Sequence, residues 1–369
     1  MKIAIVTNGR FHVLDLAREL SGLGHEVSFY SYVPLRRAQK FGLPAQCHRA
    51  LLPYVAPAMA LHRLAPAGLK SRTDHLLQIA VDRAAAHLLT PCDVFIGMSG
   101  VCVESARRAR DAFGARIILE RGSRHILSQK EILAGLPGAG VPSWAVSREL
   151  WGYDFADIIN VPSHHTESSF LERGFAPTRL FRNPYGVDLA MFQPSPVPAL
   201  AMPTAIFVGG WSLRKGCDLL WEACRRANSW RLVHVGAVLD APLPNSPLFE
   251  HHEPVSQEKL AAAYGKANIF IHASREEGLS LVQAQALACG LPLVCTDRTG
   301  GEDLRDMLDD PSWITVVPHD DPAALDEGIA RAFGIAGRQS GLRDILGGSR
   351  AQFSWRAYGK RYHDKLVSG

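Results

Sequence analysis

Apolar runs that are typical of buried strands alternate with segments of helical spacing along most of the chain. Strands are expected over residues 2–7, 26–31, 93–97, 116–120 and 157–161. Helices are expected over residues 11–23, about 102–113, and from a cap at Ser163 to Gly174. A second series has strands at 205–209, 231–236 and 269–273, with helices at 217–227 and 260–265. The pattern predicts two Rossmann-like, doubly wound α/β domains that face a central cleft.

A proline-rich segment separates the two series. Residues 194–203 contain four prolines, which makes this stretch a semi-rigid linker. We therefore expect a first domain over residues 1–193 and a second over residues 204–352.

The segment after the strand at 269–273 is the most informative part of the sequence. An acidic glycine turn at Glu277 leads into a short helix, with Ser280 as its N-cap and Gly290 as its stop. A helix that opens beyond a strand's carboxyl end directs free N–H groups and a positive dipole into the sheet crevice, where phosphates bind. Gln285 lies eight residues after Glu277, so both can reach a ligand whose phosphates rest on this helix start.

A second phosphate-binding pattern opens the second domain. The strand at 205–209 runs into a glycine turn, and Arg214 and Lys215 follow beside the next helix start. Cations and free N–H groups in one turn are suited to a diphosphate.

These two patterns resemble the retaining, nucleotide-sugar-dependent glycosyltransferases of family four, which have the GT-B fold. In that family, the first Glu of an E-x7-E region contacts the donor sugar and the second holds the ribose; here Glu277 and Gln285 occupy these positions. An amide can still bind a diol. Lys215 matches the family's G-R-x4-K-G region, whose Lys neutralises the leaving diphosphate. Gly210 stands where the family usually has Arg, so Arg214 is the candidate to supply that charge.

Three further segments extend the resemblance. Residues 183–192 resemble the family's N-G-V-D-x-x-x-F turn, and Val255 lies where the family recognises the nucleotide base. Residues 353–369 resemble the terminal helix that crosses back onto the first domain. The resemblance implies a set of donor-binding residues: Gly9, Gly209, Gly210, Val255, Gly278, Leu279, Ser280, Leu281 and Gln285.

Two turns of the first domain are expected to line the cleft. The Gly9–Arg10 turn follows the first strand, lacks a G-x-G-x-x-G pattern, and so disfavours a hydride-transfer enzyme. The other turn follows the strand at 116–120. The family often has a His there, which makes His125 a catalytic candidate beside Lys215, Arg214 and Glu277. Arg10, Arg121 and Arg124 are the candidate acceptor contacts.

Composition and charge narrow the function classes. The 369 residues are 47% apolar and 21% charged, and no apolar run approaches the roughly 20 residues that span a bilayer. The chain runs directly into a strand, which indicates no cleavable signal. Its seven scattered cysteines favour reduced thiols in the cytosol and no metal site.

Residues 27–73 contain no Asp or Glu but many cations between apolar residues. Such a stretch suits an anionic membrane surface or a lipid-phosphate acceptor, and solvated loops with a partly buried helix are the alternative. No nucleic-acid-binding module is present.

The resemblance, with the charge pattern, implies a cytoplasmic glycosyltransferase of the hexosyltransferase type, peripheral on the inner face of the cell membrane. It further implies transfer of a sugar, with retention, from a UDP- or GDP-linked donor to a hydroxyl of a glycan or polyprenyl-linked acceptor. Bacterial surface polysaccharide biosynthesis is the implied setting, and no metal or other cofactor is expected. A sugar-nucleotide epimerase is one alternative, with Asp15, Glu19, Glu104 and Glu120 as its candidate acids. A catalytically silent partner subunit is the other, suggested by Gly210 and Gln285.

Overall fold

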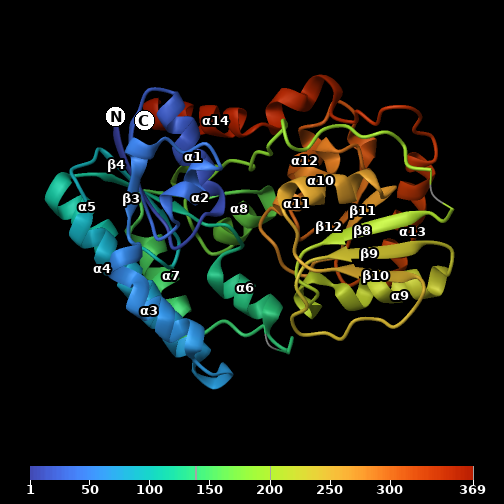
Figure 1. Ribbon diagram of the computed structural model, residues 1–369. Coiled ribbons are helices and arrows are strands. Elements are labelled where there is room, and N and C mark those ends of the chain that lie inside the picture. The colour runs from blue at the N-terminus through green and yellow to red at the C-terminus, as the bar shows by residue number, and fades with distance from the viewer. Residues whose placement is uncertain (138, 200, 369) are drawn as a thin grey trace.

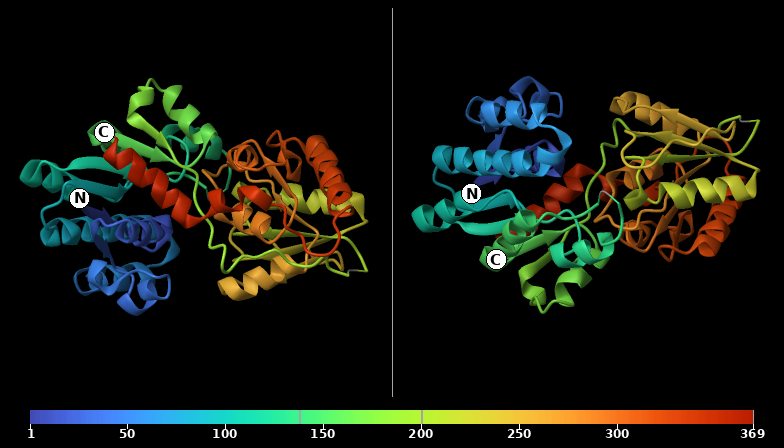
Figure 2. Two further views of the ribbon diagram at one scale, coloured as in Figure 1. Left: turned by 90° about the horizontal axis from the view of Figure 1, so that it is seen from above. Right: turned by 90° about the horizontal axis from the view of Figure 1, so that it is seen from below.

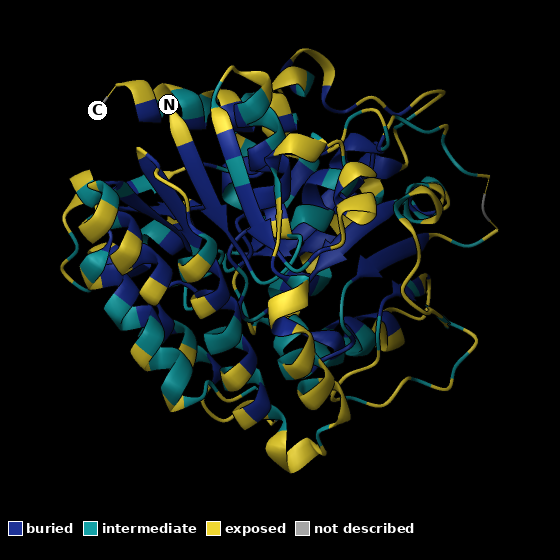
Figure 3. Cartoon of the chain, turned by 60° about the vertical axis from the view of Figure 1, so that its left-hand side comes forward, coloured by how far each residue is buried: buried dark blue, intermediate teal, exposed yellow. Residues whose placement is uncertain are grey.

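Two parallel β-sheets lie side by side, each between layers of helices (Figure 1). The computed structural model describes residues 1–137, 139–199 and 201–368. Strand interiors are buried and the outward faces of the helices are exposed (Figure 3). This arrangement explains the continuous apolar strands of the sequence, because a parallel sheet covered on both faces exposes neither. The predicted α/β class with two doubly wound sheets is confirmed.

The first sheet has seven parallel strands in the order β3-β2-β1-β4-β5-β6-β7. Its strands are β1 (Lys2–Val6), β2 (Glu26–Ser31), β3 (His48–Ala50), β4 (Val94–Met98), β5 (Arg116–Glu120), β6 (Ile158–Val161) and β7 (Leu180–Arg182). The helices of this part are α1 (Phe11–Gly22), α2 (Leu35–Gln39), α3 (Leu52–Leu64), α4 (Lys70–Leu88), α5 (Glu104–Phe113), α6 (Ile126–Leu133), α7 (Ser143–Phe155) and α8 (His164–Leu171).

The second sheet has six parallel strands in the order β10-β9-β8-β11-β12-β13. Its strands are β8 (Thr204–Val208), β9 (Arg231–Val235), β10 (Phe249–His252), β11 (Ile269–His272), β12 (Leu293–Thr296) and β13 (Ile314–Val317). Its helices are α9 (Cys217–Ala227), α10 (Gln257–Gly265), α11 (Leu281–Ala288), α12 (Gly301–Asp306) and α13 (Pro322–Ala336). The strand order reverses between β8 and β11, and an open parallel sheet binds its ligand at such a point.

The last helix, α14 (Trp355–Val367), crosses from the second sheet back to the first (Figure 2). It packs on α1, and the His363 and His25 rings lie 2.9 Å apart between their nearest nitrogens. Tyr362 donates a hydrogen bond of 2.7 Å to buried Glu120 at the end of β5. Helix α14 therefore lies against the first sheet's unit, beside α1. Gly369, the last residue of the segment predicted to form it, lies outside the described residues.

The proposed linker passes between the sheets and is attached to the second one. The Arg343 backbone N–H donates to the Ser195 carbonyl oxygen over 3.0 Å, and the Arg343 guanidinium donates to the Ser195 hydroxyl over 2.6 Å. Leu200 of this segment lies outside the described residues. We retain residues 194–203 as the proposed boundary because they fall between β7 and β8.

Candidate active site in the interdomain cleft

The two glycine turns of the second sheet meet at its reversal point. One follows β8 and contains a short 3-10 turn (Leu213–Lys215) that ends at Gly216, and the other follows β11. Gly216 has φ +70°, and a Cβ there would lie 2.1 Å from the Ala273 carbonyl oxygen. Only glycine permits this close approach. It holds the first turn directly against the end of β11.

Lys215 and Glu277 form an ion pair across these two turns. The Lys215 side chain is only 13% exposed. Burial and then the Arg214 guanidinium lower the pKa of the Lys215 ammonium, while Glu276 acts in the opposite direction. An added anion would favour the charged form. Lys215, Arg214 and the two carboxylates Glu276 and Glu277 thus form one cluster of charges at the junction of the two turns.

Arg214 and Glu276 connect this pair to the first domain. Arg214 donates to the Glu276 backbone carbonyl over 2.8 Å and to its carboxylate over 3.3 Å. Glu276 is 1% exposed and also accepts from Ser123 and, over 3.2 Å, from Gln129. Both of these partners come from the turn after β5 and the helix that follows it. The carboxyl ends of β5 and β11 therefore face each other, with Glu276 satisfied from both sides.

Residues at the start of α8, in the first domain, form hydrogen bonds with the loop that precedes α11. The Ser163 hydroxyl donates to the Gly278 carbonyl over 2.8 Å, and His165 Nε2 donates to the Glu277 carbonyl over 2.7 Å. Burial lowers the pKa of His165 to about 3, so this ring is neutral at neutral pH. A Cβ on Gly278 would lie 2.0 Å from the Gly122 carbonyl oxygen. The loop that carries Glu277 is thus fixed by contacts from both domains.

Asp303, on α12 of the second sheet, caps the same helix α8. Its carboxylate accepts from the His164 backbone N–H over 2.9 and 3.0 Å and from Arg182 over 2.9 Å. A carboxylate at a helix N-terminus satisfies free N–H groups and meets a favourable dipole. This cap is a third interdomain contact, and like Glu276 and His165 it was not identified from the sequence.

A cavity of about 950 Å³ lies between the domains at the start of α11. Val255, Leu281 and Gln285, all predicted donor-binding residues, line it from the second domain. Arg10, a predicted acceptor contact, lines it from the first. Tyr264 orients the amide of Gln285 by donating to its oxygen over 3.4 Å. The structure therefore brings predicted donor and acceptor residues to the walls of one cavity.

The remaining predicted donor residues lie in tight turns. An added Cβ on Gly9 would lie 3.0 Å from the Phe11 ring, and Gly209 has φ +145° at the end of β8. A Cβ on Gly210 would lie 2.4 Å from a methyl of Leu239. Leu239 thus covers the position where the resembled family has Arg. Leu279 and Ser280, just before α11, are 4% and 8% exposed.

His125 has a capping and packing position. Its ring accepts from the Leu127 backbone N–H over 3.3 Å at the start of α6, and it packs against Tyr153 and Phe170. Burial lowers the pKa of His125 to about 4. The contacts do not bring this ring to the Lys215–Glu277 pair, and its catalytic role stays a prediction.

The two other predicted acceptor arginines are engaged within the first domain. Arg121 is 8% exposed, pairs with Glu149 over 2.8 Å and donates to Gln129 over 2.6 Å. Arg124 lies 3.6 Å from Glu172. Their contact with an acceptor also stays a prediction.

Two of the acids considered for an epimerase already have partners. Glu120 accepts from His12 and Asn160, each over 2.8 Å, and from Tyr362. Asp15 pairs with Arg18 over 2.7 Å. Both carboxylates are therefore already engaged in hydrogen bonds within the protein.

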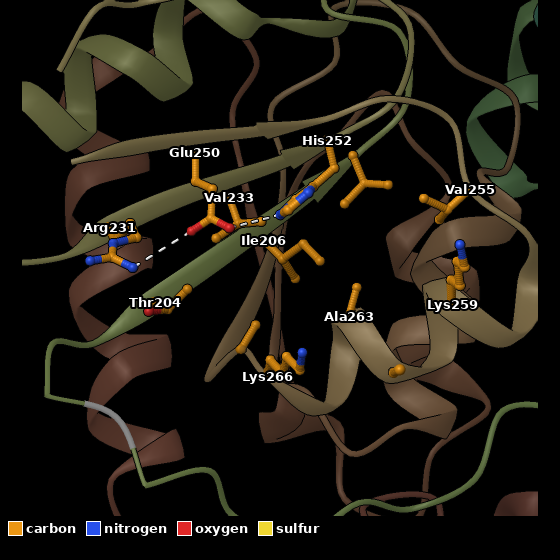
Figure 4. A pocket seen from close by; sticks show the side chains of 13 residues that line it. Thr204, Ile206, Arg231, Val233, Glu250, His252, Val255, Lys259, Ala263 and Lys266 are labelled. Atoms are coloured by element: carbon orange, nitrogen blue, oxygen red, sulfur yellow. Dashed lines mark hydrogen bonds and ion pairs between the residues drawn. The ribbon is translucent and has the colours of Figure 1, made fainter. Parts of the chain in front are cut away.

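A separate groove of about 460 Å³ follows the face of β8, β9 and β10 beside α10 (Figure 4). Ile206, Val233 and Ala263 form apolar parts of its wall, and Arg231 lies 3.6 Å from Glu250 at its rim. Val255 lines both the groove and the interdomain cavity. The groove therefore adjoins the predicted base-binding segment.

Across residues 1–137, 139–199 and 201–368, no group of three or more His, Cys, Asp or Glu side chains is placed to hold a metal ion. The expectation that no metal is required stays a prediction. None of the described helices combines the length and the apolar character that crossing a membrane requires.

The second domain matches a known family, and the whole chain matches a known fold. The family model "Glycosyl transferases group 1" matches residues 202–334. The chain also resembles sucrose-phosphate synthase from Thermosynechococcus elongatus, with a TM-score of 0.72 and 18% identity over 100% of both chains. This likeness shows the GT-B fold of two Rossmann-like domains.

Two curated relatives are similar in sequence. The D-inositol 3-phosphate glycosyltransferase of Xylanimonas cellulosilytica is 31% identical over 201 residues, which cover 47% of this chain and 47% of that protein. The GDP-mannose-dependent alpha-(1-6)-phosphatidylinositol monomannoside mannosyltransferase of Mycolicibacterium smegmatis is 28% identical over 252 residues, covering 58% and 63%. The chain spans about half the length of the first curated relatives it matches.

Proposed function

We propose that this chain is a glycosyltransferase of group 1, the family whose model matches residues 202–334, and that it moves a sugar from a nucleotide-diphosphate donor to an acceptor hydroxyl. The single observation that carries the proposal is the junction of Lys215, Arg214 and the start of α11 at the reversal point of the second sheet. Two cations and free backbone N–H groups together suit a diphosphate leaving group. The name of the mycolicibacterial relative supports a nucleotide-sugar donor.

We propose front-side substitution with retention at the anomeric carbon. The bond between the anomeric carbon and the phosphate oxygen breaks, the bond to the acceptor oxygen forms, and the departing phosphate oxygen takes the acceptor proton. Lys215 and Arg214 stabilise the negative charge that grows on the diphosphate. Glu277, held against Lys215, binds hydroxyls of the donor sugar, and Gln285 binds the ribose diol. No metal is assigned a step in this scheme.

A donor panel tests the proposal. Thermal unfolding is measured with UDP, GDP, ADP and dTDP, followed by release of the nucleoside diphosphate from the matching nucleotide sugar. At least one nucleotide should raise the melting temperature, because a ligand that binds only the folded state stabilises it. NMR of the product should show the donor's anomeric configuration. A protein that binds none of the four would instead support the silent partner subunit, for which Leu239 over Gly210 is the favouring observation.

The acceptor is proposed to be a glycan or a polyprenyl-linked glycan of bacterial surface polysaccharide assembly, on the cytoplasmic face of the membrane. Support comes from helix α3 and the residues beside it. Tyr54, Leu61 and Leu64 are 53%, 51% and 83% exposed, and they lie among the cations of residues 27–73. Exposed apolar and basic groups on one segment suit an anionic bilayer surface.

Vesicle sedimentation tests the membrane contact. The protein should sediment with phosphatidylglycerol vesicles and less with phosphatidylcholine vesicles, and Leu61→Ser with Leu64→Ser should reduce the bound fraction. Equal binding to both lipids, or none, would remove the membrane from the proposal without affecting the donor site.

A further inference from the structure

The first domain lines the interdomain cavity with cations that lack matching anions. Arg10, Arg18, Arg37 and Lys40 all lie on this wall. Arg18 is neutralised, because it lies 2.7 Å from both Asp15 and Glu19. Within residues 1–137, 139–199 and 201–368, Arg37 and Lys40 have no ion-pair partner. The wall thus keeps positive charge that its own carboxylates leave uncompensated.

Arg10 is held in place without a complete set of partners. Its guanidinium lies 3.5 Å above the Phe41 ring, a cation–π contact that fixes the plane of the group. Its nearest carboxylate oxygen, on Asp15, is 3.5 Å away, and its buried Nε has no acceptor. Burial lowers the pKa of Arg10 first, Asp15 opposes this, and the charges of Arg18 and Arg37 lower it further. A bound anion would stabilise the charged guanidinium and supply the acceptor that its Nε lacks.

The other carboxylates that line the cavity do not supply that anion. Asp188 accepts from the backbone N–H groups of Ala190 and Met191 over 3.0 and 3.1 Å. Glu258 comes from the second domain, and its pKa is lowered chiefly by a hydrogen bond from Ser256, with Lys40 the smallest contribution.

Phe11 adds an exposed aromatic face beside Arg10. Its side chain is 52% exposed, and its φ of +38° lies in the left-handed region that a bulky residue rarely adopts. Strained backbone of this kind persists where the surrounding structure imposes it, and it clusters at ligand sites. The ring lies over Gly9 and lines the same cavity. A sugar ring could stack its apolar C–H face on this phenyl group.

We propose that Arg10, Arg37 and Lys40 form a second anion subsite, which holds a phosphate group of the acceptor while Phe11 packs against the acceptor's sugar. The inference rests on the proposed transferase function and adds to it a substrate class, a phosphorylated glycan or lipid-linked sugar phosphate. The donor diphosphate is assigned to the second domain at Lys215, and these cations belong to the first domain. The two proposed anion sites therefore belong to different domains.

Glucose 6-phosphate and inorganic phosphate test this subsite on the full chain saturated with its preferred nucleoside diphosphate. Isothermal titration should show binding of both probes and none of glucose. Arg37→Ala with Lys40→Ala should weaken glucose 6-phosphate binding about tenfold or more, because hydrogen bonds to charged groups are strong. Its affinity for the nucleoside diphosphate should change less than about twofold, since no contact of the donor is removed. The matched control, Arg83→Ala with Arg108→Ala, removes the same charge from exposed helix positions outside the cavity and should bind both ligands as the wild type does.

Three results would overturn the subsite. They are no phosphate-dependent binding by the wild type, unchanged glucose 6-phosphate binding by the double variant, and a parallel loss of nucleotide affinity, which would assign these cations to the donor. A wild-type protein that binds glucose 6-phosphate but no nucleotide would instead count against the proposed transferase and leave the anion subsite standing. Phe11→Ala separates the stacking contact: it should weaken glucose 6-phosphate binding but not inorganic phosphate binding, and equal losses would remove Phe11 from the site.

Discussion

Lys215→Met is the sharpest single perturbation of the proposed donor site. Methionine keeps the apolar stem of the side chain and removes only the ammonium group. The Lys215 side chain is 13% exposed, and its ammonium group contacts Glu277. The change therefore removes one charge from the proposed diphosphate site and leaves Glu277 without its nearest cation.

The magnitude follows from the position of the ammonium group. A preorganised donor in a largely dry site is worth on the order of 3 kcal/mol in the transition state, or roughly a hundredfold in kcat. Arg214 lies 3.8 Å from the Glu277 carboxylate and retains part of the local charge, so some turnover should remain. The loss should appear mainly in kcat, because the leaving diphosphate gains charge only as the bond breaks.

The assay is nucleoside diphosphate release from the preferred nucleotide sugar, with kcat and KM measured separately. Lys266→Met is the matched control, since Lys266 lines the groove beside α10 and not the cleft. Thermal unfolding of both variants separates lost chemistry from lost folding. Turnover by Lys215→Met within about twofold of the control would refute the electrostatic role.

Three further predictions concern the interdomain contacts. His165→Gln should flatten the pH dependence of the free energy of unfolding: the folded pKa is about 3 and the unfolded value about 6.5, so protonation of the unfolded state lowers stability as pH falls. Between pH 7 and 5 the wild type should lose about 2 kcal/mol through this group in urea titrations, and equal pH slopes for both proteins would contradict the assignment. Asp303→Ala should cost about 1–2 kcal/mol in the same assay through the lost helix cap, and an unchanged urea midpoint would disprove that role. Gly278→Ala should abolish donor turnover, since its Cβ meets a backbone oxygen 2.0 Å away, whereas Gly210→Ala meets only a Leu239 methyl that can turn aside and should stay active; similar rates would disprove this distinction.

The alternation of strands and helices was the most predictable feature of the fold. The expected strand at residues 116–120 and helix at residues 217–227 coincide with β5 and α9. Both signals are local, because a buried parallel strand is apolar on both faces and an amphipathic helix repeats within a few residues.

The region of residues 27–73 was harder to interpret. Helices α2 and α3 and the start of α4 occupy much of it, where the sequence left loops or a partly buried helix open. Pro57 lies inside α3, and several apolar residues of that helix are exposed, which removes the usual helical pattern.

The contact between Lys215 and Glu277 was predictable because each lies in a short sequence segment after a strand. Lys215 and Glu277 follow two strands that border the reversal of one sheet, so their contact follows from the topology. Glu276 was not identified as a site residue, although it is adjacent to Glu277 in the sequence. Its burial depends on Ser123 and Gln129, about 150 residues away, and no local pattern reports such partners.

The first-domain contributions depend on similar long-range packing. His125 follows a strand as a cleft residue should, but Tyr153 and Phe170 enclose its ring. His165 was not identified as a site residue from the sequence, and its ring donates to the Glu277 carbonyl. Its place just after β6 was a usable signal, because carboxyl ends of parallel strands share one edge of a sheet.

The central claim is that the donor diphosphate binds between Lys215, Arg214 and the first turn of α11. A crystal structure with the preferred nucleotide sugar tests it most directly. The account predicts diphosphate oxygens within hydrogen-bond distance of Lys215 Nζ and of backbone N–H groups around Leu281, with the sugar beside Glu277. A diphosphate bound elsewhere, such as in the groove beside α10, with no contact to Lys215, would contradict it.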